Sequence, residues 1–467
     1  MSDSVRVSRR ALLGGALAGA AAVGLPSGRS GAAERRAGTA GRPASKRPGP
    51  GLLPNPKAPA GTDQLPQITT IVAVMMENHT YDSLLGTLAK GDGFTTGAHG
   101  HPTNSNPWPE GSSIPPPLRH ASLRSFPMPT PCQADGHPYN TWEAGHTSYA
   151  QGRMDGFVKS QSGPVSMGYY DASLMPFVNS LASVFPVCDR FFSSVMAQTY
   201  PNRRYFMAGT SLGLIADTLN FDRPPNGTIF EMLNAYDIPW KTYSAGAPSY
   251  LIWTYLAKEP NISSHAVGIS EFFDDAAAGT LPAYSMVDPN FGTSSEEDPQ
   301  DVQFGDQFLA QVVNAVMDSP QWSSTLLVWT YDEGGGYYDH VPPPMAVKPD
   351  DVPPMFAATD PLGGVFDRYG FRVPSGIVSP YAREDYVSDV VHDFTSILKL
   401  IETKWNLPAL TFRDAAADNL LDSIDLVGTP AFLRPPVLAD PIDPTLADRC
   451  LTKGPGTIPP MRYVTAG

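Results

Sequence analysis

The chain has 467 residues, enough for one large core or for two domains. Its hydrophobic content of 42% and charged content of 17% are ordinary for a globular protein, while 49 Pro and 42 Gly predict long ordered loops. The total charge is −14 and the first 60 residues carry +8, so the remaining residues carry −22. This acidic body argues against nucleic acid as the main partner. Cys132, Cys188 and Cys450 show no zinc-binding spacing; an exported chain could form one disulfide, and the sequence leaves its pairing open.

The N-terminus has the pattern of an export signal. Arg9 and Arg10 precede an Ala/Gly/Leu-rich stretch that is too short and too rich in small residues for a stable membrane span. We therefore predict a twin-arginine signal over residues 1–33, with a disordered basic N-terminus as the alternative. Residues 34–66 are rich in Pro, Gly, Ala and Arg, which predicts a flexible linker. The mature protein should then be secreted or held at the cell surface, without a transmembrane helix.

The first element of the folded part is a strand over residues 68–76, which are nearly all β-branched or apolar. It ends abruptly at Glu77 and Asn78, which places a carboxylate and a carboxamide at the carboxyl end of a buried strand. Ligands bind at this end of open α/β sheets. The alternative is that Asn78 only caps a helix that starts near residue 81.

Apolar periodicity then predicts helices and strands in alternation, after a loop-like stretch over residues 91–131. The helices are expected at residues 174–183, 201–208, 228–235, 304–317 and 394–405, and the strands at residues 184–192, 240–243, 283–287, 326–329 and 373–378. This alternation is typical of a largely parallel α/β sheet. Thr199 comes just before the helix that Pro201 begins, where free backbone N–H groups favour an anion. Taken alone, Thr199 is more often an ordinary helix cap.

The strand over residues 326–329 leads into the richest polar segment of the chain. Asp332 and Glu333 end the strand, three glycines allow a sharp turn, and Asp339 and His340 follow. Carboxylates and a histidine within nine residues form a ligand set suited to a divalent cation. The alternative is an ordinary polar loop at a strand end.

Seven segments in order resemble the phosphoesterase family of bacterial phospholipases C and acid phosphatases, within the alkaline-phosphatase-like superfamily. They are MMENHTYDSLLG (75–86), GRMDGFV (152–158), MGYYD (167–171), LASVFPVCDRFFSS (181–194), TYPNRRYFMAGT (199–210), TYDEGGGYYDHVPPP (330–344) and RVPSGIVSPYA (372–382). The resemblance implies an α/β sandwich with a mostly parallel central sheet flanked by helices. It implies a catalytic domain over residues 67–426, followed by a Pro-rich tail over residues 427–467.

The resemblance also implies the roles of several residues. Glu77, Asn78, Asp332 and Glu333 would surround a divalent metal ion and the phosphate. Thr199 would be the nucleophile, because a metal ion activates a hydroxyl that is otherwise weak. A second set is predicted to act around them: His340 as an acid or as a residue that orients a ligand, and Asn140, His146, Asn202 and Asp298 as substrate contacts.

The chain departs from the family pattern at two positions. Asn140 stands where the family usually has His, and Asp298 stands where it usually has the His of a His-Pro pair. Asn keeps a donor but cannot act as an acid, whereas Asp reverses the charge and could repel a phosphate or bind metal. His137 and His146 lie near the first position and could substitute for the missing histidine.

These observations predict an exported metal-dependent phosphoric-ester hydrolase, with a phospholipase C favoured over an acid phosphatase. The lost histidines motivate a second class, in which the same scaffold cleaves another ester such as a sulfate or a phosphonate. The third is a non-catalytic exported binding protein, which would have no need of Thr199 as a nucleophile.

Overall fold

The computed structural model describes residues 48–108, 121–133, 138–356, 363–444 and 463–465. Its centre is an eight-stranded sheet with the order β12-β6-β11-β10-β1-β9-β7-β8. The strands are β1 (Thr70–Met76), β6 (Val187–Cys188), β7 (Trp240–Ser244), β8 (Ala266–Gly268), β9 (Tyr284–Asp288), β10 (Thr325–Tyr331), β11 (Ser375–Val378) and β12 (Val387–Ser388). The predicted signal segment and His137 lie outside the described residues.

Strand β1 lies in the middle of this sheet and is buried over its whole length. It pairs in parallel with β10 on one side and with β9 on the other. Strand β11 is antiparallel to both β10 and β6, whereas the pairs β12–β6, β7–β8 and β7–β9 are parallel. The sheet is therefore mostly parallel, as the alternating pattern predicted.

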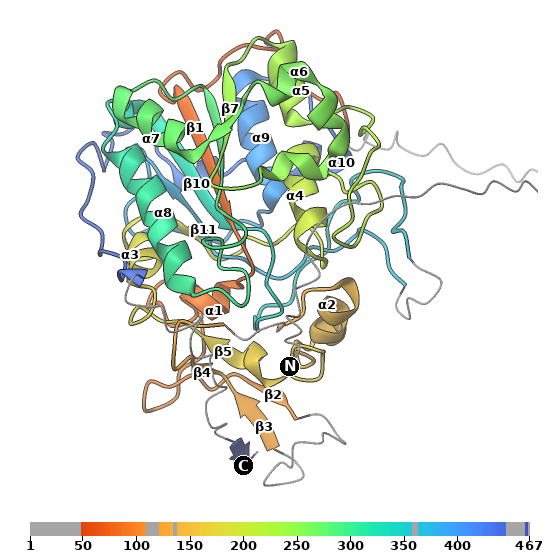
Figure 1. Ribbon diagram of the computed structural model, residues 1–467, viewed down its shortest axis with the longest axis vertical. Coiled ribbons are helices and arrows are strands. Elements are labelled where there is room, and N and C mark those ends of the chain that lie inside the picture. Colours follow the sequence, from red (N-terminus) through yellow and green to blue (C-terminus); the bar gives the residue numbers. More distant parts are fainter. Residues whose placement is uncertain (1–47, 109–120, 134–137, 357–362, 445–462, 466–467) are drawn as a thin grey trace, which may run out of the picture. The chain divides into compact units, whose positions relative to one another are not determined.

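Helices cover both faces of the sheet (Figure 1). Helices α3, α7 and α8 pack together on one side, and α4, α9 and α10 on the other. An apolar face on each helix explains this packing. In α8, the buried residues recur at the spacing of one helical face: Phe308, Leu309, Val312 and Val316. The helices are α1 (Tyr81–Leu85), α2 (Trp142–Tyr149), α3 (Pro176–Val184), α4 (Thr199–Ala208), α5 (Ile229–Ala235), α6 (Pro260–Ser263), α7 (Ile269–Ala278), α8 (Val302–Met317), α9 (Phe394–Trp405) and α10 (Phe412–Ala416).

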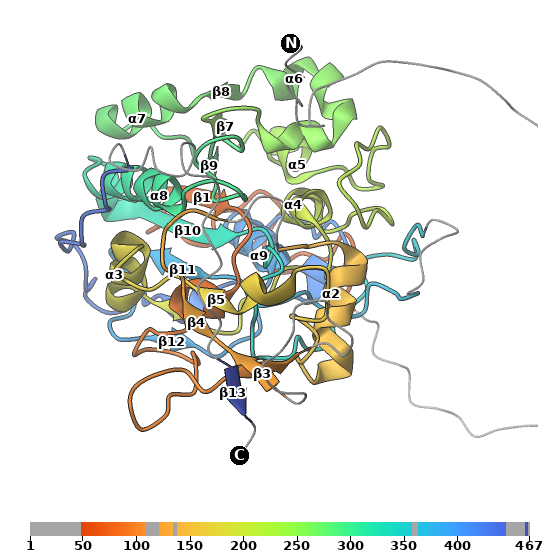
Figure 2. The same ribbon diagram turned by 60° about the horizontal axis from the view of Figure 1, so that its bottom comes forward.

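Smaller elements gather at the end of the sheet where β1 runs into α1 (Figure 1). Strands β13 (Tyr463–Thr465), β3 (Ala121–Arg124) and β2 (Ser105–Pro107) form a three-stranded sheet, and β4 (Phe126–Pro127) pairs with β5 (Gly168–Tyr169). Figure 2 shows β5 and β3 beside α2. The stretch predicted as loop thus contains three short strands, whose two to four residues are too few for a visible period. Single turns of 3-10 helix occur at Ala150–Gly152, Gly163–Met167, Ser249–Ile252, Thr254–Lys258, Trp322–Ser324 and Leu421–Ser423.

Two predicted segments differ from what their composition suggested. A strand was predicted over residues 184–192, but the observed strand, β6, has only two residues. The segment predicted as a flexible linker is described from residue 48 on, and there it is held to the domain. The backbone N–H of Gln64 donates to the carbonyl of Lys404, and that of Asn55 donates to Oδ1 of Asn406. A Pro- and Gly-rich composition thus indicates irregular backbone and does not exclude ordered contacts.

Two further findings concern the cysteines and the membrane. Cys132 is part of a disulfide, whereas Cys188 is a buried free thiol. None of the helices in the described part of the chain is long and apolar enough to cross a bilayer.

Candidate active site at the carboxyl ends of β1, β9 and β10

The two polar strand ends predicted from the sequence meet at one edge of the sheet. Met76 lies opposite Tyr331 in the parallel pair of β1 and β10, so both strands end at the same level. The backbone N–H of Asp332 donates to the carbonyl of Met76 at 3.1 Å. The backbone N–H of Asn78 donates in turn to Oδ1 of Asp332 at 3.3 Å. This exchange places Asn78 beside the carboxylate of Asp332.

The glycines after Glu333 allow the chain to turn against the end of β1. Gly335 has φ of +60°, a conformation that residues with a side chain rarely adopt, and a Cβ at this position would lie 2.0 Å from the carbonyl oxygen of Asn78. The backbone N–H of Gly335 donates to Oε2 of Glu333 at 2.7 Å. The turn therefore fixes Glu333 while it brings two backbone segments into contact.

Arg203 of α4 binds this strand end from the other side. Its Nε donates to Oδ2 of Asp332 at 3.0 Å and its Nη1 to Oδ1 of Asp288 at 3.3 Å. Nη2 donates to the carbonyl of Met76 at 3.0 Å. Arg203 was not among the site residues predicted from the sequence, although its spacing of four residues from Thr199 places both on one helical face.

Burial dominates the electrostatics of the carboxyl groups. It raises the pKa of Glu77 well above its usual value, and Glu297 and Asp332 raise it further. Burial also raises the pKa of Asp332, to about 6, although Arg203 acts in the opposite direction. The pKa of Glu333 is raised by burial and by Asp332. Several buried carboxyl groups thus lie near a single positive charge, that of the Arg203 guanidinium. A divalent cation bound among them would stabilise this arrangement.

Two buried oxygen atoms of the site have no hydrogen-bond partner among the described residues: Oε2 of Glu77 and Oδ1 of Asn78. Buried oxygen atoms without partners are costly, so their occurrence in a strand-end cluster calls for an explanation. Carboxylate and carboxamide oxygens are ligands of hard cations. The residues present therefore fit a divalent metal ion.

Thr199 is the first residue of α4, and only 7% of its surface is exposed. The helix cap is Gln198, whose side chain makes no capping bond, so Thr199 does not take the ordinary cap position. The next residue, Tyr200, donates its backbone N–H to Oδ1 of Asp217 at 2.7 Å. Thr199 thus occupies the end of the helix at which partial positive charge gathers.

Asn202 lies one turn into α4 and holds the loop that precedes it. Its Nδ2 donates to the carbonyls of Val195, Ala197 and Gln198, and its Oδ1 accepts from the backbone N–H of Val195. The side chain therefore shapes the turn that leads into Thr199.

Asn140 and His146 were both predicted as substrate contacts, and they line different hollows of the structure. Nδ2 of Asn140 donates to Oε1 of Glu333 at 2.7 Å, and both residues line one small pocket. The ring of His146 stacks on Trp142 with 4.2 Å between centroids, and its Nδ1 lies 2.8 Å from the Trp142 carbonyl oxygen. His146 lines a different hollow together with Arg153. Of these two residues, Asn140 is therefore the one that contacts the carboxyl cluster, through Glu333.

Asp298 belongs to the segment that follows β9 and approaches the end of β1. The backbone N–H of Glu77 donates to the carbonyl of Ser295 at 2.9 Å. Glu297 was not part of the predicted site. Its charge raises the pKa of Glu77 and also that of Asp332. Strand β9 ends at Asp288, well before this segment, so the signal for Glu297 in the sequence is its position beside Asp298.

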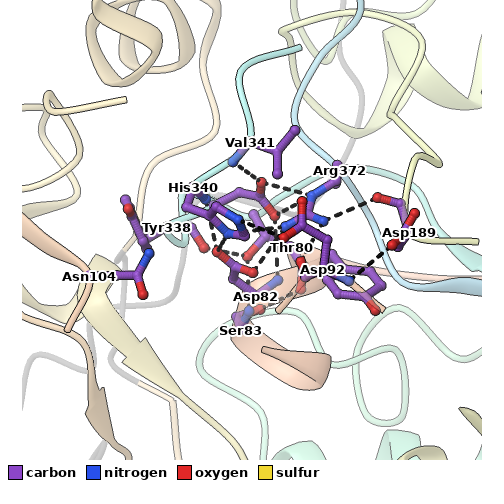
Figure 3. Close-up of polar contacts among 12 residues, drawn as sticks. Thr80, Asp82, Ser83, Asp92, Asn104, Asp189, Tyr338, His340, Val341 and Arg372 are labelled. Atoms are coloured by element: carbon purple, nitrogen blue, oxygen red, sulfur yellow. Dashed lines mark hydrogen bonds and ion pairs between the residues drawn. The ribbon is translucent and has the colours of Figure 1, made fainter. Parts of the chain in front are cut away.

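His340 belongs to a second cluster, with Asp82, Asp92 and Arg372 (Figure 3). Asp339 joins this cluster through its ion pair with Arg372. Its Nδ1 lies 2.7 Å from Oδ2 of Asp82 and its Nε2 lies 3.3 Å from Oδ1 of Asp92. Burial lowers the pKa of His340, but the hydrogen bond and charge of Asp82 outweigh it and raise the pKa to about 9.

The second cluster also has the spacing of a metal site. Asp82, Asp339 and His340 each bring one ligand atom within 4.8 Å of the others. However, Nε of Arg372 donates to Oδ1 of Asp339 and its Nη2 to Oδ1 of Asp82, both at 3.0 Å. A buried guanidinium thus already supplies a positive charge between the two carboxylates. We therefore interpret this cluster as an ion-pair network that ties the 338–341 segment to α1.

The model of the phosphoesterase family matches residues 68–408. The chain belongs to this family. It is 31% identical over 393 residues to non-specific phospholipase C6 of Arabidopsis thaliana, covering 78% of this chain and 73% of the relative. It is 28% identical over 424 residues to phospholipase C A of Mycobacterium tuberculosis, covering 79% of this chain and 80% of the relative. Among solved structures, an alkaline phosphatase superfamily protein from Vibrio parahaemolyticus has a TM-score of 0.38 and 10% identity, over 66% of this chain and 73% of that one.

Membership of this family confirms the resemblance found in the sequence, and with it the prediction of a phosphoric-ester hydrolase. The observed mostly parallel sheet, with helices on both faces, confirms the predicted fold class.

Proposed function

We propose that the protein is an exported, metal-dependent phospholipase C that cleaves a phosphodiester through Thr199. The observation that carries the proposal is the pair of buried oxygen atoms without partners on Glu77 and Asn78, beside Asp332. The relatives named phospholipase C in Arabidopsis thaliana and Mycobacterium tuberculosis support the diester as substrate.

Glu77, Asn78, Asp332 and Glu333 would hold the metal ion. When bound, such an ion supplies a Lewis acid that lowers the pKa of a hydroxyl and offsets the charge of a phosphoryl group. The chain positions these ligands itself. Arg203 holds Asp332 by its Nε, and Asn140 holds Glu333 by its Nδ2.

Thr199 performs the first chemical step in this proposal. Its Oγ1 loses its proton and attacks the phosphorus atom, the bond from phosphorus to the lipid alcohol oxygen breaks, and that oxygen takes up a proton, so the step neither gains nor loses a proton overall. The positive end of the α4 dipole would stabilise the phosphoryl group, since Tyr200 donates its backbone N–H to Asp217 and Pro201 has none. Water then attacks the phosphothreonine, which releases the phosphorylated headgroup and restores the hydroxyl. Asn140 and Asp298 would contact the substrate, with Asn202 supporting the loop before Thr199.

Hydrolysis of p-nitrophenylphosphorylcholine beside p-nitrophenyl phosphate tests this proposal. The Thr199→Ala variant should lose diester cleavage by at least about a thousandfold, because removal of a nucleophile costs this much or more. The matched control is Thr429→Ala, since Thr429 is an exposed threonine of the Pro-rich tail. Unchanged cleavage in Thr199→Ala would remove Thr199 from the mechanism. Dialysis against a chelator should abolish activity, and full retention would exclude the metal ion.

The second candidate is an acid phosphatase, and the same assay separates it from the first. Cleavage of the monoester alone would identify a phosphatase. Export has its own test, in which replacement of Arg9 and Arg10 by Lys should leave the protein inside the producing cell. Export of that double variant at the usual level would exclude the twin-arginine route.

A further inference from the structure

Two large apolar side chains are exposed on the loop that follows α4. Leu219 is 53% exposed and Phe221 is 65% exposed, whereas Asn220 between them is only 8% exposed. Asn220 forms a β-bridge with Trp253, so the backbone is extended here and successive side chains point to opposite faces. Leu219 and Phe221 therefore project together into solvent. Single exposed apolar residues are common, but two on one face of a fixed segment indicate a contact surface.

The backbone of this loop is held in place by hydrogen bonds. The carbonyl of Thr218 accepts from Nη2 of Arg204 in α4. The backbone N–H of Asn220 donates to the carbonyl of Ile252 at 3.3 Å, and the carbonyl of Asn220 accepts from the backbone N–H of Thr254 at 2.8 Å. The segment around these anchored residues is therefore fixed, and its two apolar side chains cannot turn inward without loss of the bonds.

The same loop is bonded to the start of α4, where the proposed nucleophile lies. Oδ1 of Asp217 accepts from the backbone N–H of Tyr200 at 2.7 Å, and the backbone N–H of Asp217 donates to Oε1 of Gln198 at 3.2 Å. Tyr200 and Gln198 are the two neighbours of Thr199 in the chain. An extended chain spans at most about 3.6 Å per residue, so the backbone of Phe221 lies within about 15 Å of Asp217. The exposed apolar pair is thus near the start of α4.

A neighbouring segment adds a third exposed apolar side chain. The backbone N–H of Met355 donates to the carbonyl of Gly213 at 2.7 Å, and Met355 is 54% exposed. The hydroxyl of Thr210 donates to Oδ2 of Asp350, which joins the two segments at a second point. Exposed apolar side chains are therefore carried by two joined segments beside the start of α4.

We propose that Leu219, Phe221 and Met355 form an apolar rim that inserts into the headgroup region of a phospholipid layer, a role that rests on the proposed phospholipase function. Insertion holds the start of α4 against the layer, so a lipid phosphodiester reaches Thr199 without first leaving the membrane. The charge of the protein selects the kind of layer. The chain carries −14 in total and +8 in its first 60 residues, so the remaining part carries −22. A zwitterionic layer such as phosphatidylcholine is therefore favoured over an anionic one.

Co-sedimentation of the full chain with phosphatidylcholine vesicles tests the apolar rim. All proteins in this assay carry Thr199→Ala, so that the lipid is not consumed. The double variant Leu219→Ser, Phe221→Ser should bind the vesicles at least about fivefold more weakly. The matched control is Leu433→Ser, Val437→Ser, because these residues are 51% and 96% exposed elsewhere on the surface, and it should bind like the parent. Both double variants should unfold at the same urea concentration as the parent, since all four side chains are exposed.

Phe221→Trp measures the insertion directly. Phosphatidylcholine that is brominated on its acyl chains should quench the fluorescence of this variant more than that of the wild type, because bromine quenches an indole only at close range. Val437→Trp is the control, and its quenching should not exceed that of the wild type. Equal quenching in the two variants would place residue 221 in water and overturn the proposal.

Activity on vesicles, compared with activity on a soluble diester, separates the apolar rim from the active site. In the Leu219→Ser, Phe221→Ser variant with Thr199 intact, the ratio of kcat/KM for phosphatidylcholine vesicles to kcat/KM for p-nitrophenylphosphorylcholine should fall at least about tenfold. An unchanged ratio would overturn the apolar rim and leave the phospholipase function standing. A wild-type chain that cleaves neither substrate would overturn the proposed function. The binding and quenching measurements need no catalysis, so they would still decide whether the rim inserts.

Discussion

Arg203 and Asp332 form a fully buried ion pair in which Nε donates to Oδ2 at 3.0 Å. The pair joins helix α4, which begins at Thr199, to the end of strand β10. The proposed nucleophile and the proposed metal ligands are thereby held in one rigid arrangement. Because displacement of a reacting group by about 1 Å can cost a hundredfold in rate, this connection bears on catalysis as well as on stability.

Replacement of Arg203 by Ala tests this connection. The variant leaves Asp332 and Asp288 buried without their cation, so the free energy of unfolding should fall by about 3–5 kcal/mol. Arg203→Lys keeps the charge but loses the planar fork that reaches both carboxylates, so its loss should be smaller. Urea denaturation followed by circular dichroism measures both values.

The control for this series is Arg153→Ala. Arg153 pairs with Asp155 at 3.0 Å, but its side chain is 62% exposed. Solvent screens such a pair, so the change in unfolding free energy should stay within about 0.5 kcal/mol. If Arg203→Ala were as stable as Arg153→Ala, the buried pair would contribute nothing to the free energy of unfolding.

Gly335→Ala should damage the site through the backbone. The new Cβ would meet the carbonyl oxygen of Asn78 at 2.0 Å and would also impose a left-handed conformation on Ala. We expect a loss of about 3 kcal/mol or more in unfolding free energy, together with weaker metal binding as Asn78 shifts. Chemical denaturation and metal titration measure the two effects.

Gly163→Ala separates conformational strain from collision. Gly163 has φ of +64°, close to that of Gly335, but its Cβ would find nothing within 4 Å. Its cost should therefore be limited to about 1–2 kcal/mol of backbone strain. Equal losses in the two variants would contradict the close approach of Gly335 to Asn78.

Much of the site follows from local patterns in the sequence, and the remainder depends on contacts across the chain. Two buried runs that end in Glu77-Asn78 and Asp332-Glu333 were recognisable, and adjacent parallel strands then bring those ends together. No local pattern shows that Arg372 reaches Asp82, because 290 residues separate them. The partners of buried charges are chosen by tertiary packing, which composition and periodicity do not record.

His340 should make stability depend on pH. Its pKa is raised to about 9 from about 6.5, so its protonated form stabilises the fold fully below about pH 6.5. This contribution should be lost as pH rises through about 9, and it amounts to about 3 kcal/mol. Urea unfolding at intervals between pH 6 and pH 9.5 measures the loss, and NMR of the imidazole protons measures the pKa.

Asp82→Asn removes the carboxylate that raises this pKa. The variant should lower the pKa of His340 and flatten the pH dependence of stability over the same range. His99→Gln serves as the control, because His99 is exposed and its loss should leave the slope unchanged. A steep slope that persists in Asp82→Asn would assign the pH dependence to another group.

Asn140→Asp should lower activity by disturbing Glu333. Asn140 donates from Nδ2 to Oε1 of Glu333 at 2.7 Å, and a carboxylate in its place would repel that oxygen. Loss of a residue that orients a metal ligand typically costs about 10–100-fold, so we expect a fall of this size in kcat/KM for the diester. Asn140→His restores an N–H donor and should recover part of the activity, whereas the exposed Asn314→Asp on α8 should change nothing. If Asn140→Asp keeps full activity while Asn140→His loses it, the side chain at this position acts by its size and not by holding Glu333.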